Sequence, residues 1–221
     1  MNAAPSLALG RREANRRNRR EAILDIARSS FLEHGYDATT MSAIAASLGG
    51  SKGTLWSYFP CKEQLFAAVI DEATEAFQTQ LPEILNPRDG VQIALARFCR
   101  EYLQKVVSPD AIALQRTVIA ASARLPEVGR IFHERALTRT RHRLAIFLRE
   151  AMARGQLRSS DAMIAAHQLT QLCVSGCHQL LLLRLIDDVT PEDIGRDVER
   201  AMDTFMRAFA AGDDTHEGQH D

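Results

Sequence analysis

Residues 38–66, ATTMSAIAASLGGSKGTLWSYFPCKEQLF, constrain the fold most strongly, because they hold two short helical patterns separated by glycines. The first pattern begins at Thr40, a residue type that caps helices well. Its apolar residues recur at the i, i+3, i+4 and i+7 positions of one helix face, namely Met41, Ile44, Ala45 and Leu48. Gly49 and Gly50 tolerate the left-handed backbone that a sharp helix end requires. The spacing therefore predicts a short amphipathic helix followed by a turn.

The second pattern starts after Ser51, which can cap a helix, and stops at Pro60, which cannot continue one. Two helices of this length, joined by a turn of three or four residues, make a helix-turn-helix. In that motif the second helix enters the major groove of DNA while the first crosses the backbone.

The second helix is expected to have one buried and one outward face. At about 100° per residue, Leu55 and Phe59 fall on one side of the helix. The opposite side carries a cation, a glycine, an indole and a hydroxyl, from Lys52, Gly53, Trp56 and Ser57. These groups can approach and hydrogen-bond a phosphate-lined groove, and none is a bulky aliphatic side chain that needs burial.

Three motifs lie in order around this segment: FLEHGYDATT from Phe31, SKGTLWSYF from Ser51 and KEQLF from Lys62. With them, roughly residues 18–66 resemble the DNA-binding domain of the TetR/AcrR family of bacterial transcriptional regulators. The resemblance implies that family contacts with DNA fall on several of these positions. The interface that we expect with double-stranded DNA comprises Thr40, Ser51, Lys52, Gly53, Thr54, Trp56, Ser57, Tyr58 and Lys62.

The remainder of the chain is predicted to be helical. Helical patterns continue over residues 62–81, 89–107, 110–123, 127–154, 161–186 and 191–211, and no strand-like alternation occurs. The stretch from Phe98 through SPDAIALQRTVIAASARLPEVGRIFHE resembles one helical ligand-domain subgroup of the same family. We therefore expect an all-α fold, in which a three-helix helix-turn-helix head precedes a helical-bundle domain for ligand binding and dimerisation.

Four segments are expected along the chain. They are a disordered basic arm over residues 1–17, the DNA-binding head over 18–66, the helical body over 67–211 and an acidic disordered tail over 212–221. The arginines between Arg11 and Arg20 either solubilise the arm or reach DNA phosphates.

Charge is distributed as this division predicts. The formal net charge is −1, yet residues 1–62 hold nine Lys or Arg against five Asp or Glu, which leaves the rest of the chain acidic. A basic head on an acidic body is typical of a protein that faces nucleic acid. No apolar run is long enough to span a membrane, and four cysteines in 221 residues are too few for a disulfide scaffold. A cytoplasmic protein is expected.

The pattern over residues 161–186 indicates a dimer. Apolar and small residues recur there at helical spacing, and we expect Leu169, Leu172, Cys173, Gly176, Leu180 and Leu183 in a homodimer interface. The end of this segment is apolar on nearly every side, more than one neighbouring helix can cover. The alternative is a single thick core within one chain.

Polar residues that interrupt the apolar faces of the body suggest a ligand pocket. The candidates are Cys99, Tyr102, Gln115, Arg116, His167 and Gln171. Each of them could instead lie at the boundary of the core. The family resemblance implies a pocket for a small-molecule effector.

The sequence predicts neither catalytic residues nor a cofactor. Cys173, Cys177 and His178 lie close enough in sequence to suggest a metal or redox centre, but a structural site needs four ligands and no second cluster is present. We therefore expect no metal and no enzyme activity. The function that the resemblance implies is a repressor, released from a palindromic operator by a small-molecule effector. The alternatives are a ligand-independent or activating DNA-binding regulator and a helical-bundle metal or redox protein.

Overall fold

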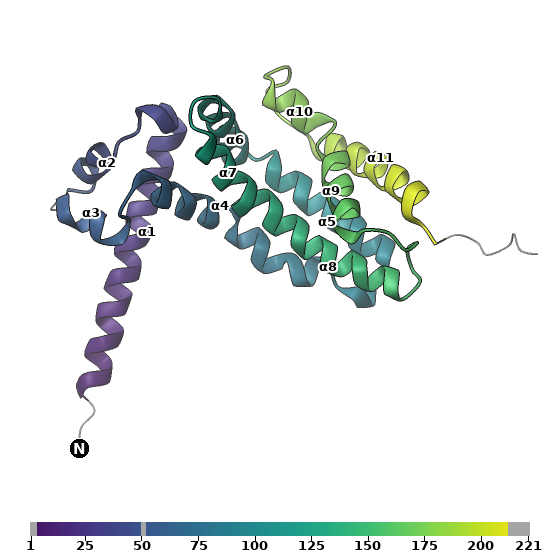
Figure 1. Ribbon diagram of the computed structural model, residues 1–221, viewed down its shortest axis with the longest axis horizontal. Helices are drawn as coiled ribbons and strands as arrows, with labels where there is room; N and C mark the ends of the chain where they lie inside the picture. Colours follow the sequence, from purple (N-terminus) through teal and green to yellow (C-terminus); the bar gives the residue numbers. More distant parts are fainter. Residues whose placement is uncertain (1–3, 50–51, 212–221) are drawn as a thin grey trace, which may run out of the picture. The chain divides into compact units, whose positions relative to one another are not determined.

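A computed structural model describes residues 4–49 and 52–211 of the chain. These residues are helical and contain no β-strand, apart from an isolated bridge between Leu157 and Ala210. They form two compact units, one comprising Met1–Ala73 with Ala113–Arg135 and the other Thr74–Ile112 with Ala136–Asp221. Figure 1 shows the helices of both. The all-α prediction is confirmed.

Helix α1, Ala4–Ala38, opens the first unit. Residues 4–17 belong to it, contrary to the irregular arm expected over residues 1–17. The difference has a local cause, because arginine, glutamate and alanine favour helix and the side chains of Arg17 and Glu21 form an i,i+4 ion pair at 3.9 Å. Gly35 interrupts the helical backbone near the end of α1, with φ at 81°.

The helix-turn-helix is formed by α2, Met41–Ser47, and α3, Lys52–Tyr58. The Thr40 hydroxyl accepts a hydrogen bond from the Ala43 amide at 3.1 Å, which confirms the predicted cap. Gly49 has φ at 62°, so the turn uses the left-handed conformation that the glycine pair predicts. The second glycine of that pair, Gly50, and the predicted cap Ser51 lie outside the described residues.

The core of the first unit is an aromatic cluster between α1 and α4, Lys62–Ile84. The rings of Phe31 and Tyr36 stack at 5.6 Å, and Phe66 meets each of them edge-on at 5.0 Å. All three side chains are buried. Such ring pairs stabilise a core by about 0.5–1.5 kcal/mol each, in addition to the effect of the area that they bury. Here they hold α4 against α1.

Two further helices contribute residues to the first unit. They are α6 (Pro109–Ser122) and α7 (Pro126–Phe132). The Thr117 hydroxyl, within the part of α6 that belongs to this unit, lies 3.4 Å from the main-chain oxygen of Phe31. The division of the chain therefore differs from the predicted boundary after residue 66, because helices distant in sequence pack against α1.

The second unit is a helical bundle. It contains η1 (Pro87–Asp89), α5 (Val91–Val106), η2 (His133–Thr138, in part), α8 (Arg139–Ala153), α9 (Ala162–Cys173), α10 (Cys177–Leu182) and α11 (Pro191–Phe209). Helix α9 packs against α5, α8 and α11 around the apolar core (Figure 1). Two predicted helices are interrupted. A π-helical segment, η2, divides the helix expected over 127–154, and residues 174–176 separate α9 from α10 within the helix expected over 161–186.

Candidate nucleic-acid interface

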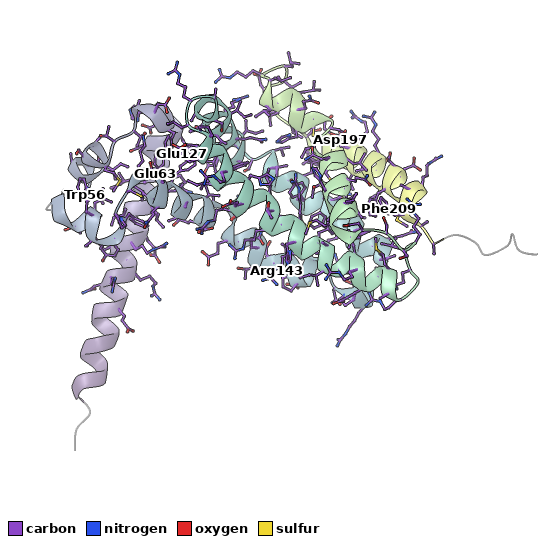
Figure 2. All side chains as sticks on the ribbon, in the orientation of Figure 1. Trp56, Glu63, Glu127, Arg143, Asp197 and Phe209 are labelled. Atoms are coloured by element: carbon purple, nitrogen blue, oxygen red, sulfur yellow. The ribbon has the colours of Figure 1, made fainter. Side chains whose placement is uncertain are left out.

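Helix α3 has the two faces that its sequence predicts. Leu55 is fully buried and Phe59 is 5% exposed, so both anchor the helix in the first unit. Trp56, labelled in Figure 2, is 38% exposed and lies about 100° around the helix from Leu55. Gly53 and Ser57 are also exposed, and a Cβ added at Gly53 would meet no atom within 4 Å. The exposed side of α3 is therefore free of steric obstruction from its own unit.

The hydroxyl groups near α3 are partly used within the fold. The Ser57 hydroxyl donates a hydrogen bond to the main-chain oxygen of Thr54 at 2.7 Å. The Thr40 hydroxyl oxygen accepts the Ala43 amide, and its own proton remains available to a phosphate oxygen. Thr54 and Tyr58 are half-buried at the edge of this face. The exposed surface thus offers both donors and acceptors.

Lys62 is held within the first unit by main-chain oxygens. Its ammonium donates to Tyr36 O at 2.8 Å and to Thr39 O at 3.0 Å, and it lies 4.1 Å from the centre of the Tyr36 ring. Burial lowers the pKa of this amine, while Asp37 and Glu63 oppose that shift. An ammonium group has three N–H donors, so one remains for a partner outside the chain. Lys62 joins the start of α4 to the end of α1.

Two arginines of α1 extend the basic surface toward α3. The guanidinium carbon of Arg16 lies 5.9 Å from the centre of the Tyr58 ring, and that of Arg20 lies 5.6 Å from the Phe59 ring. Both residues are exposed. The sequence left open whether these arginines solubilise the arm or reach DNA phosphates. Continuing the helical pattern upstream from Ile23 would have placed them on α1.

The predicted DNA-binding residues gather on one part of the first unit, from the cap of α2 to the start of α4. Those described with their side chains are Thr40, Gly53, Thr54, Trp56, Ser57, Tyr58 and Lys62. Ser51 and the side chain of Lys52 lie outside the described part of the structure.

The six predicted pocket residues do not form one site. Gln115 and Arg116 belong to the first unit. In the second unit, His167 and Gln171 are exposed on α9, whereas Cys99 and Tyr102 lie buried in the core.

The second unit also contains buried polar residues that the sequence analysis did not single out. They are Gln78 on α4, Thr140 and Arg141 on α8, and Thr170 on α9. A signal was present, because Arg141 precedes Leu144 and Ala145 by three and four positions and so occupies the apolar face of α8.

The predicted dimer residues divide between the core and the surface. Leu169 and Cys173 are fully buried in their own unit, and Leu172 packs against the same core. Gly176 lies against Asp197 of α11, whose carboxylate accepts the Cys177 amide at 2.6 Å. Leu180 and Leu183 remain 43% and 61% exposed. A groove of about 690 Å³ lies beside them, lined by α9, α10 and α11, and includes Gln171, His178 and Phe205.

The cysteines do not have the surroundings of a reactive or metal-binding site. Burial and the adjacent Asp197 carboxylate raise the pKa of the Cys177 thiol to about 12, which keeps it protonated at neutral pH. Within residues 4–49 and 52–211, no three His, Cys, Asp or Glu side chains are grouped to hold a metal ion. In that part of the chain, no helix combines the length and the apolar character needed to cross a bilayer.

Two family models match separate parts of the chain. Residues 23–69 match the family described as bacterial regulatory proteins, tetR family. Residues 93–211 match the family described as AefR-like transcriptional repressor, C-terminal domain. The first match contains α2, α3 and the start of α4, and the second contains nearly all of the helical body.

Individual relatives are similar to this chain over most of its length. The HTH-type transcriptional regulator UidR of Escherichia coli is 28% identical over 198 residues, covering 87% of this chain and 91% of UidR. The HTH-type transcriptional repressor ComR of Escherichia coli is 28% identical over 144 residues, 62% of this chain and 67% of ComR. The solved structure of the flavonoid-responsive regulator FrrA has 36% identity and a TM-score of 0.76, covering 87% of this chain and 97% of FrrA. With a helix-turn-helix head, a helical body and both family matches, the chain belongs to the TetR family of bacterial transcriptional regulators.

Proposed function

We propose that the protein is a homodimeric repressor that places α3 of each protomer in the major groove of a palindromic operator. The observation that carries this proposal is the orientation of α3. Leu55 is buried, while Gly53 and Trp56 form an open outer face with hydrogen-bonding groups beside it. The indole supplies both apolar contact with thymine methyl groups and one donor, and the glycine allows the backbone to approach the duplex.

The basic residues around α3 supply the sequence-independent part of binding. Arg16 and Arg20 lie against the rings of Tyr58 and Phe59, and Lys62 keeps one ammonium proton available. Cations at these positions neutralise phosphates and release counterions, which makes binding strongly salt-dependent. They orient the head, and α3 then selects the sequence.

Dimerisation through α10 and the groove beside it supports this mode of binding. Leu180, Leu183 and Leu185 are 43%, 61% and 67% exposed, an apolar surface that a second copy would cover. One recognition helix contacts only a few base pairs, whereas two heads about 34 Å apart read two half-sites on one face of the duplex. The symmetry of the protein would then be that of the operator.

Release by an effector is proposed as a shift between two populations of the dimer. A ligand that binds the body better in the released state lowers operator affinity by no more than its preference for that state. Helix α4 is one continuous connection, because it begins in the first unit with Lys62 and ends in the second with Ile84. The relative FrrA is named for its response to flavonoids, which supports a small organic molecule as the signal here.

Selection of bound DNA from a random pool tests this proposal. The expected product is an inverted repeat whose half-sites are about one helical turn apart, bound by one dimer. The recovered operator would then be titrated with small molecules, and affinity should fall with the effector. Recovery of no preferred sequence would contradict DNA reading by α3. An operator that no small molecule releases would leave a ligand-independent regulator.

A further inference from the structure

The core of the second unit contains a buried amide with an unused acceptor. Gln78 is 6% exposed, and its Nε2 donates to the Thr140 hydroxyl at 2.7 Å. Its Oε1 is fully enclosed and accepts no hydrogen bond from the described part of the chain. An enclosed carbonyl oxygen without a donor is costly, so native proteins keep few of them without a reason.

A buried cation without an anion lies beside it. Arg141 follows Thr140 on α8, is 9% exposed, and donates from Nε to the Thr170 hydroxyl at 3.3 Å. Among the described residues, no carboxylate pairs with its guanidinium and no other side chain accepts from it. Buried arginines are almost always paired, because an uncompensated charge is expensive in an apolar interior. The guanidinium has the planar fork that binds a carboxylate with two parallel bonds.

Three aromatic side chains, Phe77, Phe98 and Tyr102, pack against one another in the core of the same unit. The Tyr102 ring lies 6.1 Å from Phe77 and 5.6 Å from Phe98, and Phe77 directly precedes Gln78 on α4. Burial raises the pKa of Tyr102 to about 12, and the nearby Arg141 charge acts in the opposite direction. The Tyr102 hydroxyl therefore stays protonated and can donate a hydrogen bond. These three buried polar groups belong to one unit and are linked by the Gln78–Thr140 hydrogen bond, by the adjacent positions of Thr140 and Arg141 on α8, and by the charge of Arg141 acting on Tyr102.

We infer that Gln78, Tyr102 and Arg141 form the effector site, and that the effector is a small aromatic acid. Its oxygen anion would pair with Arg141, and a hydroxyl on the same molecule would donate to Gln78 Oε1. Phe77 and Tyr102 would contact its ring. This inference rests on the proposed function and extends it, because it assigns the site and the charge of the signal.

Calorimetry on the full-length dimer tests whether the ligand must carry a negative charge, by comparing acids with their matched neutral amides. The probes are 4-hydroxycinnamate and 2-naphthoate, each compared with its neutral amide. Both acids should bind at least about tenfold more tightly than their amides, since a hydrogen bond between two charged groups is stronger than one to a neutral amide. Phenolates could supply the same oxygen anion, so 4-nitrophenol is titrated above and below its own pKa. Tighter binding above that pKa identifies a phenolate as an accepted ligand.

Substitution of Arg141 tests whether this residue binds a ligand or only stabilises the fold. Arg141→Met should abolish the preference for acids over amides while the melting temperature of the free protein stays the same or rises, because an unpaired buried charge is removed. Thr170 keeps its bonds to the main-chain oxygens of Ala166 and His167, so no new unpaired group is created. The control is Arg143→Met on the exposed side of α8 (Figure 2), which should keep the preference for acids.

A second variant keeps the test decisive if Arg141→Met fails to fold. Gln78→Met removes the unpaired oxygen and should weaken 4-hydroxycinnamate, which carries a hydroxyl, more than 2-naphthoate, which has none. Equal binding of acids and amides, or no binding of any acid or phenol, would overturn the inference. Operator binding is measured in parallel. A protein that binds its operator and ignores all the acids retains the proposed function, whereas loss of operator binding in the parent protein refutes the function itself.

Discussion

The ammonium group of Lys62 lies 2.8 Å from the main-chain oxygen of Tyr36 and donates a hydrogen bond to it. A second bond, to Thr39 O at 3.0 Å, reaches the residue just before the cap of α2. The side chain thus connects the start of α4 with the chain that enters the helix-turn-helix. Because of these bonds, Lys62 has a structural task besides the phosphate contact that the sequence predicts.

Replacement of Lys62 by methionine should reveal both roles, the structural one and the phosphate contact. Loss of the two hydrogen bonds should lower the free energy of unfolding by about 1–3 kcal/mol, measured by urea denaturation. Loss of one phosphate contact should reduce the slope of log affinity against log salt by about 0.9. Lys105→Met, in α5, is the control and should leave the salt slope unchanged. If stability falls in Lys62→Met while its slope stays at the parent value, Lys62 has only the structural task.

Gly53→Glu should abolish operator binding without altering the fold. A Cβ at this position meets no atom within 4 Å, so the side chain is tolerated in the free protein. In the groove, however, it would place a carboxylate against phosphates and remove the close approach of the backbone. Gel-shift titration, circular dichroism and dimer mass are the measurements. Gly195→Glu in α11, also without neighbours within 4 Å of the added Cβ, is the matched control. Normal binding by Gly53→Glu would place another face of the head on DNA.

Leu183→Asp should dissociate the dimer. Leu183 is 61% exposed, and burying an aspartate without a partner in an apolar interface costs several kcal/mol. The dimer dissociation constant should rise at least about a hundredfold by sedimentation. Ile93→Asp is the control, because Ile93 is equally exposed, at 62%, on α5. Monomers should also lose operator affinity; a dimer that persists would locate the interface elsewhere.

Glu72→Gln should stabilise the first unit at neutral pH. Burial raises the pKa of Glu72, and its enclosed Oε2 has no hydrogen-bond partner among the described residues. A carboxyl group whose folded pKa is raised favours the folded state when it is protonated. The ionised Glu72 carboxylate therefore destabilises the fold increasingly as pH rises above the ordinary pKa of 4.5. The stability difference between variant and parent should therefore increase with pH and become constant above the folded pKa. Denaturation curves across that range measure it, and an unchanged difference would show that Glu72 is solvated. Glu75→Gln, on the exposed side of α4, is the control.

The helix-turn-helix could be predicted from sequence because its signals are local. Thr40 lies three residues from the amide that it caps, and Leu55 and Phe59 are one helical turn apart. The role of Lys62 could not be predicted in this way, since its acceptors lie 23 and 26 residues earlier in the chain. The same limit applies to Arg141, which donates to a hydroxyl 29 residues away. Helical periodicity indicates which face is buried, but not which distant atoms meet it.

The break between α9 and α10 could not be predicted for a similar reason. Apolar residues continue at helical spacing through residues 161–186, so periodicity predicts one helix. In the structure Gly176 leaves the helical backbone with φ at −108° and ψ at −117°, and Asp197 of α11 binds the amide that follows. The deviation depends on a carboxylate 20 residues further along the chain, and no local pattern reports it.

Gly176 has a practical consequence for engineering. A Cβ added there would overlap the Asp197 carboxylate, which is buried and already committed to the Cys177 amide. Mutant libraries that aim to retune a biosensor built on this scaffold should therefore hold the codons for Gly176 and Asp197 constant. Diversity is better placed at exposed positions away from the proposed interface, such as Arg143 on α8.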